Sequence, residues 1–192
     1  MFLLDFLFMA SNINTYLYLL REPQSIFMKN LFIIRHAKSS WANMSQRDIE
    51  RPLNKRGKRD APFMAKLLKQ TGVNPDLIVS SPANRAFTTA SFFAEAYGIN
   101  ANDIQKESKI YDAFPSDILD IIREFSDKNN IVLLFGHNPT FTSVANMFSE
   151  SMISNMPTCS IVKIEADIEK WSDFSARNGT LTQFHYPKQY FT

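Results

Sequence analysis

Three short runs of apolar residues, each bounded by polar positions, divide the sequence. They cover residues 31–35, 76–80 and 131–135. A run of this length between turn-forming residues is typical of a strand that is buried on both faces, as in a parallel sheet. We therefore expect these three segments to lie in the middle of a sheet.

The intervals between these runs carry apolar residues at helical spacing. This spacing predicts helices at about 54–70, 84–97, 116–127 and 140–149. Their ends coincide with residues that favour helix termini: Asn54 and Ser116 as N-caps, Pro139 near a start, and Gly72 and Gly98 at C-terminal ends. Pro62 is expected either to kink the first helix or to fall early in its second part.

The remaining segments complete the fold prediction. Residues 36–53 have no sustained period and many polar groups, which predicts a long functional loop, and a short edge strand is expected within 104–110. The tail alternates apolar and polar positions over 158–165, 170–174 and 180–186, and Asn178-Gly179 favours a hairpin. The fold class predicted is α/β: a three-layer α/β/α sandwich with a mainly parallel central sheet and an antiparallel C-terminal hairpin.

The chain has 192 residues, enough for one domain with a buried core. Its first 27 residues differ from the rest. The apolar stretch Met1–Met9 contains Asp5, lacks a basic start typical of signal peptides and is too short to span a membrane. We expect residues 1–27 to be an appended segment, either helical or not native, and residues 28–192 to form the domain.

The net charge and the cysteine content indicate which classes of partner and which cellular compartment the sequence favours. The 21 Lys and Arg residues nearly balance the 19 Asp and Glu residues, so charge gives no case for a nucleic-acid or membrane partner. Cys159 is the only cysteine, which excludes an internal disulfide and fits a reducing, cytoplasmic location. Cys159 itself is expected to be a small core residue.

Polar side chains follow all three predicted buried strands. Arg35 and His36 end the first, Ser80 and Ser81 end the second with Arg85 one helical turn later, and His137 follows the third. The carboxyl ends of parallel strands share one edge of a sheet, where ligands of α/β proteins bind. Two guanidinium groups and two imidazoles brought together there need an anion, and a phosphoryl group matches the Arg donors.

An imidazole in such a site can also act as a nucleophile. The ordinary His pKa of about 6.5 leaves much of the side chain neutral near neutral pH. Attack on phosphorus would give a phosphohistidine intermediate and divide the transfer into two steps. The sequence offers no metal-binding cluster, because it has neither an H-E-x-x-H motif nor paired cysteines.

The polar residues belong to three motifs: Arg35-His36-Ala37-Lys38-Ser39, Ser80-Ser81-Pro82-Ala83-Asn84-Arg85-Ala86 and Gly136-His137-Asn138-Pro139. In this order they resemble the motifs of the histidine phosphatase (phosphoglycerate mutase-like) superfamily. The short length and the R-H-A-K-S and G-H-N-P forms are most similar to its SixA-like branch of phosphohistidine phosphatases. The resemblance covers about residues 28–186 and implies a metal-independent hydrolase of phosphoric monoesters or phosphoramidates, without a cofactor.

The resemblance also implies roles for single residues. His36 matches the phosphorylated nucleophile of the family, and Arg35 and Arg85 match its phosphate-binding arginines. His137 matches the second pocket histidine. Asn43 resembles a loop residue that often faces the phosphate.

Two further positions are less closely matched to the family. Asp112 is the nearest match to the acidic proton donor of larger members, although the small branch often lacks a well-placed acid. A phosphohistidine substrate needs less protonation of its leaving group. Lys38 departs from the usual R-H-G form and is expected at the mouth of the pocket.

Structural roles compete with these functional ones. The charged residues between Arg47 and Asp60 are expected to form a solvated surface, the alternative being a basic rim that attracts an anionic substrate. Arg85 could make an ordinary ion pair, and Asp112 could form a turn before Pro115. The Ser80-Ser81-Pro82 step is expected to be mostly a strand-to-helix turn, and His185 to be structural or exposed.

Three functions remain open on the sequence. The favoured one is a phosphatase that removes phosphate from phosphohistidine on a partner protein, which would suit an open, shallow pocket. The second is a phosphatase for a small phosphorylated metabolite. The third is a non-catalytic module that binds a phosphorylated partner.

Overall fold

The structure is a computed structural model that describes residues 28–191. The predicted appended segment 1–27 lies outside the described residues. A six-stranded sheet has the order β3-β2-β4-β1-β5-β6. Its strands are β1 (Met28–Arg35), β2 (Leu77–Ser80), β3 (Gln105–Lys106), β4 (Ile131–Gly136), β5 (Ile161–Asp167) and β6 (Gly179–His185).

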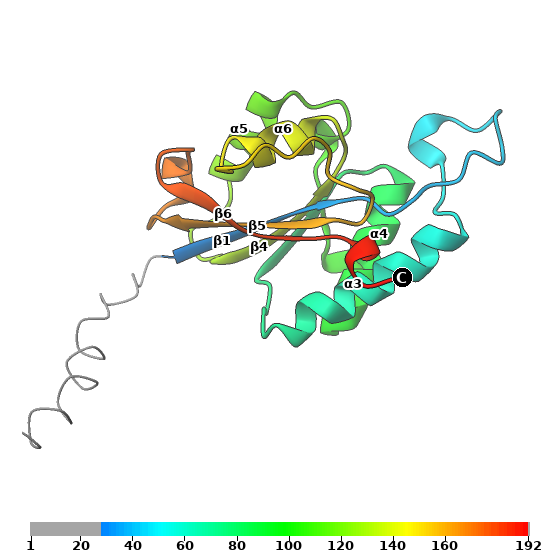
Figure 1. Ribbon diagram of the computed structural model, residues 1–192, viewed down its shortest axis with the longest axis horizontal. Helices are drawn as coiled ribbons and strands as arrows, with labels where there is room; N and C mark the ends of the chain where they lie inside the picture. The colour runs from blue at the N-terminus through cyan, green and yellow to red at the C-terminus, as the bar shows by residue number, and fades with distance from the viewer. Residues whose placement is uncertain (1–27, 192) are drawn as a thin grey trace, which may run out of the picture.

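The sheet is parallel on one side of β1 and antiparallel on the other. Strands β1, β4, β2 and β3 pair in parallel, whereas β5 pairs antiparallel with both β1 and β6. Two helices, α3 (Lys55–Gln70) and α4 (Asn84–Tyr97), cover one face; α5 (Pro115–Arg123) and α6 (Thr140–Asn146) cover the other (Figure 1). The predicted three-layer sandwich with an antiparallel C-terminal hairpin is confirmed.

The alternation of side chains along β1 explains why this strand is central. Leu31 and Ile33 pack into the core on the α5 and α6 side, and Phe32 and Ile34 pack into the core on the α3 and α4 side. All four side chains are buried. A strand that buries both faces has to lie between neighbours and under helices on both sides, as its sequence predicts.

Local end signals predicted two helix boundaries well. The Asn54 side chain accepts the Gly57 N–H at 2.9 Å and begins α3. Gly98 takes a left-handed conformation, with φ of 72°, after α4 has ended at Tyr97, as expected. Helix α3 continues through Pro62.

Other boundaries differ from the predictions, and the reasons are specific contacts. Helix α5 begins at Pro115, one residue before the predicted cap Ser116, because the Asp117 carboxylate accepts the Phe114 N–H at 2.8 Å. The predicted strand 170–174 is a 3₁₀ helix, Trp171–Asp173. There, Trp171 donates its backbone N–H to Asp127 and its indole N–H to the Asn129 carbonyl, and neither bond belongs to a sheet.

Two more segments are shorter than predicted. The edge strand expected within 104–110 is reduced to the two residues of β3, followed by the 3₁₀ helix Ser108–Ile110. Helix α6 ends at Asn146. The Asn178-Gly179 pair does not form a tight turn but closes a longer connection, in which the Asn178 side chain accepts the Ser175 N–H.

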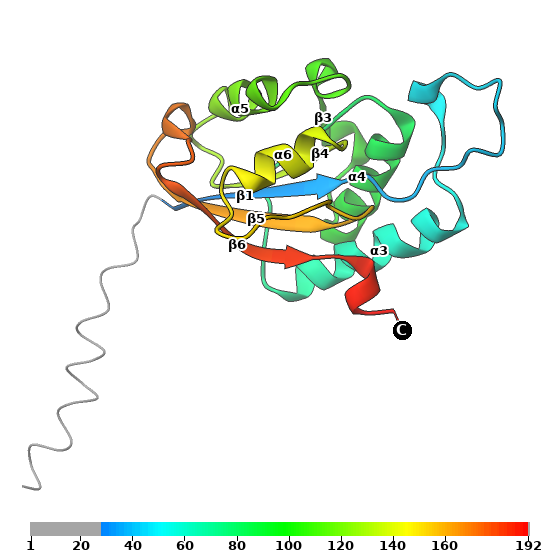
Figure 2. The same ribbon diagram turned by 45° about the horizontal axis from the view of Figure 1, so that its top comes forward.

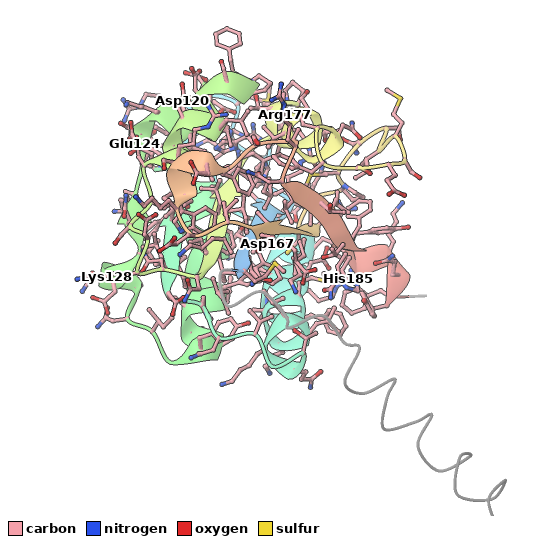
Figure 3. The ribbon with its side chains drawn as sticks, turned by 90° about the vertical axis from the view of Figure 1, so that its left-hand side faces the viewer. Asp120, Glu124, Lys128, Asp167, Arg177 and His185 are labelled. Atoms are coloured by element: carbon pink, nitrogen blue, oxygen red, sulfur yellow. The ribbon has the colours of Figure 1, made fainter. Side chains whose placement is uncertain are left out.

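The predicted functional loop follows β1 and extends beyond the sheet, on the same side as the carboxyl end of β1 (Figure 2). Its two arms meet where Ser39 pairs with Leu53. In the view turned by 90° from Figure 1, the labelled side chains of Asp120 and Glu124 lie close together and Lys128 lies below them (Figure 3). Within residues 28–191, no helix has both the length and the apolar character needed to cross a bilayer.

Candidate active site

The residues that follow β1, β2 and β4 meet at one edge of the sheet. The backbone N–H of His36 donates to the Gly136 carbonyl at 3.0 Å, and the N–H of Ser81 donates to the Phe135 carbonyl at 3.0 Å. These bonds extend the parallel ladders by one step beyond the strands. They bring the ends of all three predicted buried strands together.

A small hollow of about 180 Å³ opens at this edge. It is lined by Arg35, His36, Lys38, Ser39, Trp41, Arg51, Arg85 and Thr158. Three of the predicted site residues, Arg35, His36 and Arg85, are therefore around one cavity. The fourth, His137, lies against His36, with 5.2 Å between the ring centroids.

The environment of His36 fixes its tautomer. Its Nδ1 lies 2.7 Å from the Ala37 carbonyl oxygen, which can only accept a hydrogen bond. The hydrogen of the neutral ring is therefore on Nδ1, and Nε2 keeps its lone pair. Burial lowers the pKa of His36 to about 4, and the nearby charges of Arg85 and Arg35 act in the same direction. His36 is thus neutral at neutral pH, and its Nε2 has a lone pair that can act as a base or a nucleophile.

His137 is held by Ser81. The Ser81 Oγ lies 2.8 Å from Nε2 of His137 and also accepts the Ala83 N–H at 3.3 Å. The Ser81 hydroxyl has a hydrogen that it can donate to Nε2, and when it does so the ring hydrogen of neutral His137 is on Nδ1. That Nδ1 is buried and has no partner among residues 28–191. Burial, with a contribution from His36, lowers the pKa of His137 to about 3.

The two predicted arginines are anchored differently. Arg35 donates from Nη1 to the Met156 carbonyl at 2.5 Å, and its buried Nε has no partner in the described part of the chain. Arg85 donates from Nη1 to the backbone oxygen of Asp48 at 2.7 Å and from Nη2 to the Asp48 carboxylate at 2.9 Å. These two bonds fix the plane of the Arg85 guanidinium and leave its other N–H groups for a ligand.

Asp48 is a site residue that the sequence analysis did not single out. Besides Arg85, its carboxylate accepts hydrogen bonds from Arg51 at 2.6 Å and from the Tyr111 hydroxyl at 2.7 Å. Burial alone would raise the pKa of Asp48, but the bonds from Tyr111 and Arg51 and the charge of Arg85 outweigh it and lower the pKa to about 2. Asp48 is therefore ionised and balances two guanidinium groups at once.

The charged run that contains Asp48 was expected to be a solvated surface, and this is wrong for two of its members. Arg51 is only 6% exposed, because Asp48, Ser39 and the Ser40 carbonyl accept its donors. Asp60 is 2% exposed and pairs with Arg59. The spacing of Asp48 and Arg51, three residues apart, was the available signal for a local ion pair.

Two other candidates lie apart from the hollow. Asn43 is exposed, and its side-chain oxygen accepts the backbone N–H of Ser45 at 3.1 Å. Asp112 is exposed and lines a different hollow of about 440 Å³. Neither residue lines the cavity beside His36.

His185 and Cys159, to which the sequence analysis gave no role in the site, do not line the hollow. His185, on β6, lies near the edge of the sheet, and its Nδ1 is 2.7 Å from the Tyr190 hydroxyl (Figure 3). Cys159 is buried, and its backbone N–H donates to the carbonyl groups of Arg35 and His36. Burial raises the pKa of the Cys159 thiol, which keeps it protonated.

The hollow suits a tetrahedral oxyanion. Arg35, Lys38, Arg51 and Arg85 contribute four positive charges to its lining, and Asp48 offsets them only in part. Within residues 28–191, no group of three or more His, Cys, Asp or Glu side chains is placed to hold a metal ion. The arrangement can bind a phosphoryl group through guanidinium donors and offer it a neutral imidazole nitrogen.

Comparisons with known proteins agree with this geometry. Residues 31–110 match the family model of the histidine phosphatase superfamily (branch 1). An uncharacterized chloroplastic protein of Arabidopsis thaliana is 30% identical over 166 residues, which cover 82% of this chain and 76% of that protein.

Solved structures share the fold along most of the chain. SixA from Agrobacterium tumefaciens superposes with a TM-score of 0.69 at 29% identity, covering 83% of this chain and 99% of that one. The structure of the protein histidine phosphatase SixA complexed with tungstate gives a TM-score of 0.70 at 20% identity, covering 83% of this chain and 98% of that one.

Proposed function

We propose that this chain, which belongs to the histidine phosphatase superfamily and is a phosphatase, hydrolyses phosphohistidine on a partner protein through a phosphoryl intermediate on His36. The observation that carries the proposal is the state of His36. Its Nδ1 is hydrogen-bonded to the Ala37 carbonyl, and its pKa is lowered to about 4, so Nε2 presents a lone pair beside the phosphate-binding arginines.

The reaction would proceed in two steps. In the first, Nε2 of His36 attacks phosphorus, a P–N bond forms to His36, and the P–N bond of the substrate breaks with its electron pair going to the substrate imidazole. In the second, a water oxygen attacks phosphorus and the P–Nε2 bond breaks. Inorganic phosphate leaves, the proton of the water passes to phosphate or solvent, and His36 returns to its neutral form.

The cationic side chains would act on the transferring group throughout. Arg35 and Arg85 would hold the phosphoryl oxygens, and His137 would donate from Nδ1, the nitrogen that has no partner among residues 28–191. Fixed donors of this kind stabilise charge that develops in the transition state without having to reorient. Asp48 would keep the Arg85 guanidinium in its plane, as a positioning residue.

The lack of a suitable acid favours phosphohistidine over an alkyl phosphate. No carboxyl group is among the residues that line the hollow, and Asp48, behind Arg85, has a pKa of about 2 and is ionised. An alkoxide leaving group needs a proton donor, whereas an imidazole protonated on its other nitrogen leaves as a neutral ring. The size of the hollow, about 180 Å³, also leaves most of any substrate outside.

The decisive experiment traps the intermediate. Enzyme mixed with a phosphohistidine peptide is quenched without acid and digested, and mass spectrometry locates the phosphoryl group. We expect it on His36, labile to mild acid as a phosphoramidate, and absent from His36→Ala. His185→Gln is the matched control, because His185 lies outside the hollow.

A substrate panel separates the alternatives. Faster turnover of phosphohistidine than of sugar or serine phosphates supports the proposal, and the reverse order indicates a phosphatase for small metabolites. Binding of the phosphopeptide without turnover in the wild-type protein would indicate a phosphate-binding module. A phosphoryl group found on another residue would rule out His36 as the nucleophile.

A further inference from the structure

We infer that Trp41 is the surface on which the leaving group of the substrate lies, and that the site therefore favours phosphoryl groups carried on a flat ring. This inference rests on the proposed phosphatase activity and specifies the class of leaving group. Trp41 lies in the loop after β1 and lines the same hollow as Arg35, His36 and Arg85. Even so, 61% of its surface is exposed.

Trp41 is exposed but not loosely placed. The guanidinium carbon of Arg51 lies 3.2 Å from the centroid of the Trp41 ring and covers one of its faces. Arg51 is buried and donates to the Asp48 carboxylate and to the Ser39 hydroxyl, each at 2.6 Å. A stacked guanidinium held by two such bonds is a rigid backing for an indole ring.

The backbone beside Trp41 is fixed as well. The Ser40 N–H donates to the Pro52 carbonyl at 2.8 Å, and the Ser40 carbonyl accepts from Nε of Arg51 at 3.1 Å. The two arms of the loop are thus joined immediately before Trp41. The covered face of the ring is held by protein, so its exposed surface is available to a ligand.

The position of Trp41 suits the leaving group more than the phosphoryl group. In a hollow of about 180 Å³ bounded by arginines, the phosphoryl group would lie against the guanidinium groups, and the bond that breaks has to point outward, away from the attacking Nε2 of His36. Besides His36, Trp41 is the residue of the lining that carries an aromatic ring. A flat ring leaving in this direction gains contact with an indole face, whereas a flexible chain gains little.

Binding of two non-hydrolysable phosphonates tests the inference without requiring turnover. Phenylphosphonate carries a flat ring and methylphosphonate does not. Titration calorimetry of the wild-type protein is expected to give about tenfold tighter binding of phenylphosphonate. In Trp41→Ala the ratio should fall to about twofold or less, and Trp41→Phe should restore most of it.

Met44→Ala is the matched control. Met44 is an exposed apolar residue of the same loop that does not line the hollow. This variant should keep the wild-type ratio. An equal ratio in the wild-type protein and Trp41→Ala, or no preference for the ring in the wild-type protein, would overturn the inference.

Turnover provides an independent readout. The ratio of kcat/KM for a phosphohistidine peptide to that for acetyl phosphate should fall about tenfold in Trp41→Ala, because acetate is a good leaving group without a ring. If the protein binds the ring-bearing phosphonate more tightly but turns over no substrate, the proposed function is wrong and the inference on Trp41 stands. If it turns over substrate but shows no preference for the ring, the inference on Trp41 is wrong and the proposed function stands.

Discussion

The imidazole rings of His36 and His137 lie side by side, with centroids 5.2 Å apart and planes inclined by 54°. Both rings are buried, and burial is the main reason that the pKa values are lowered, to about 4 for His36 and about 3 for His137. Two protonated rings at this distance would repel each other and the surrounding arginines. At neutral pH the lowered pKa values keep both rings neutral, which avoids this repulsion.

The first prediction concerns pH and stability. The pKa of each ring is lower in the folded protein than the ordinary value of about 6.5, so the unfolded chain takes up protons first as pH falls. The stabilising effect of a neutral ring is complete above about pH 6.5 and is lost as pH falls through the folded pKa. We expect a loss on the order of 1–2 kcal/mol for each ring at pH 5.

Urea unfolding between pH 7.5 and 4.5 measures this loss. The His137→Gln variant should lose less stability over the same range than the wild-type protein. Parallel curves for the two proteins would contradict the prediction.

The pH dependence of kcat/KM provides a second measurement, because it reports the ionisation of the free enzyme. After correction for ionisation of the substrate, kcat/KM should fall on the acid side near pH 4 and not near pH 6.5.

The second prediction concerns Asp48. Asp48→Asn keeps the shape of the side chain but removes the charge that holds Arg85 and Arg51. We expect kcat to fall about tenfold, because the Arg85 guanidinium is no longer held in the orientation that stabilises the transition state. Inhibition by inorganic phosphate should become no weaker, since an anion near the site has been removed.

Steady-state kinetics with phosphate as a competitive inhibitor separates these effects. Asp112→Asn is the control, because Asp112 lines another hollow. Weaker phosphate inhibition in Asp48→Asn with unchanged kcat would refute the positioning role.

The third prediction concerns Ser81. Ser81→Ala removes the partner of Nε2 of His137 and leaves a buried ring nitrogen unpaired. We expect a loss of about 1–2 kcal/mol in unfolding free energy, and a change in the tautomer of His137 visible by nitrogen NMR. Ser80→Ala is the matched control: Ser80 is equally buried but donates to the Ser81 carbonyl and not to a histidine. An unchanged nitrogen NMR signal of His137 in Ser81→Ala would contradict the tautomer with its hydrogen on Nδ1.

The fourth prediction concerns the contact between α3 and the loop after β1. A Cβ on Gly57 would lie 2.3 Å from the backbone oxygen of Lys38, which also accepts the Asn54 N–H. Because backbone atoms on both sides are fixed, Gly57→Ala should cost about 3 kcal/mol. It should also lower activity, since Lys38 lines the hollow. Urea denaturation against Lys58→Ala, at an exposed position on the same helix, measures the cost; equal midpoints would contradict it.

The sequence by itself determined the layers of this fold and the edge that carries the site. The apolar run Leu31–Ile34 has no polar face, so β1 had to be central and covered on both sides. Helix α4 has its predicted bounds because the signal that ends it, Gly98, is local. Arg35 and His36 follow such a strand directly, and this position alone placed them at the carboxyl edge of the sheet.

The tertiary structure decided which charged and aromatic residues lie beside Arg35 and His36 at this edge. Asp48, Arg51 and Trp41 lie in a loop without periodicity, and what holds them beside the hollow is contact with one another and with Arg85 and Tyr111, which are distant in sequence. Hydrophobic patterns indicate which side chains avoid water, whereas an ion pair between distant residues is defined by the distance between two side chains, which no pattern along the chain contains.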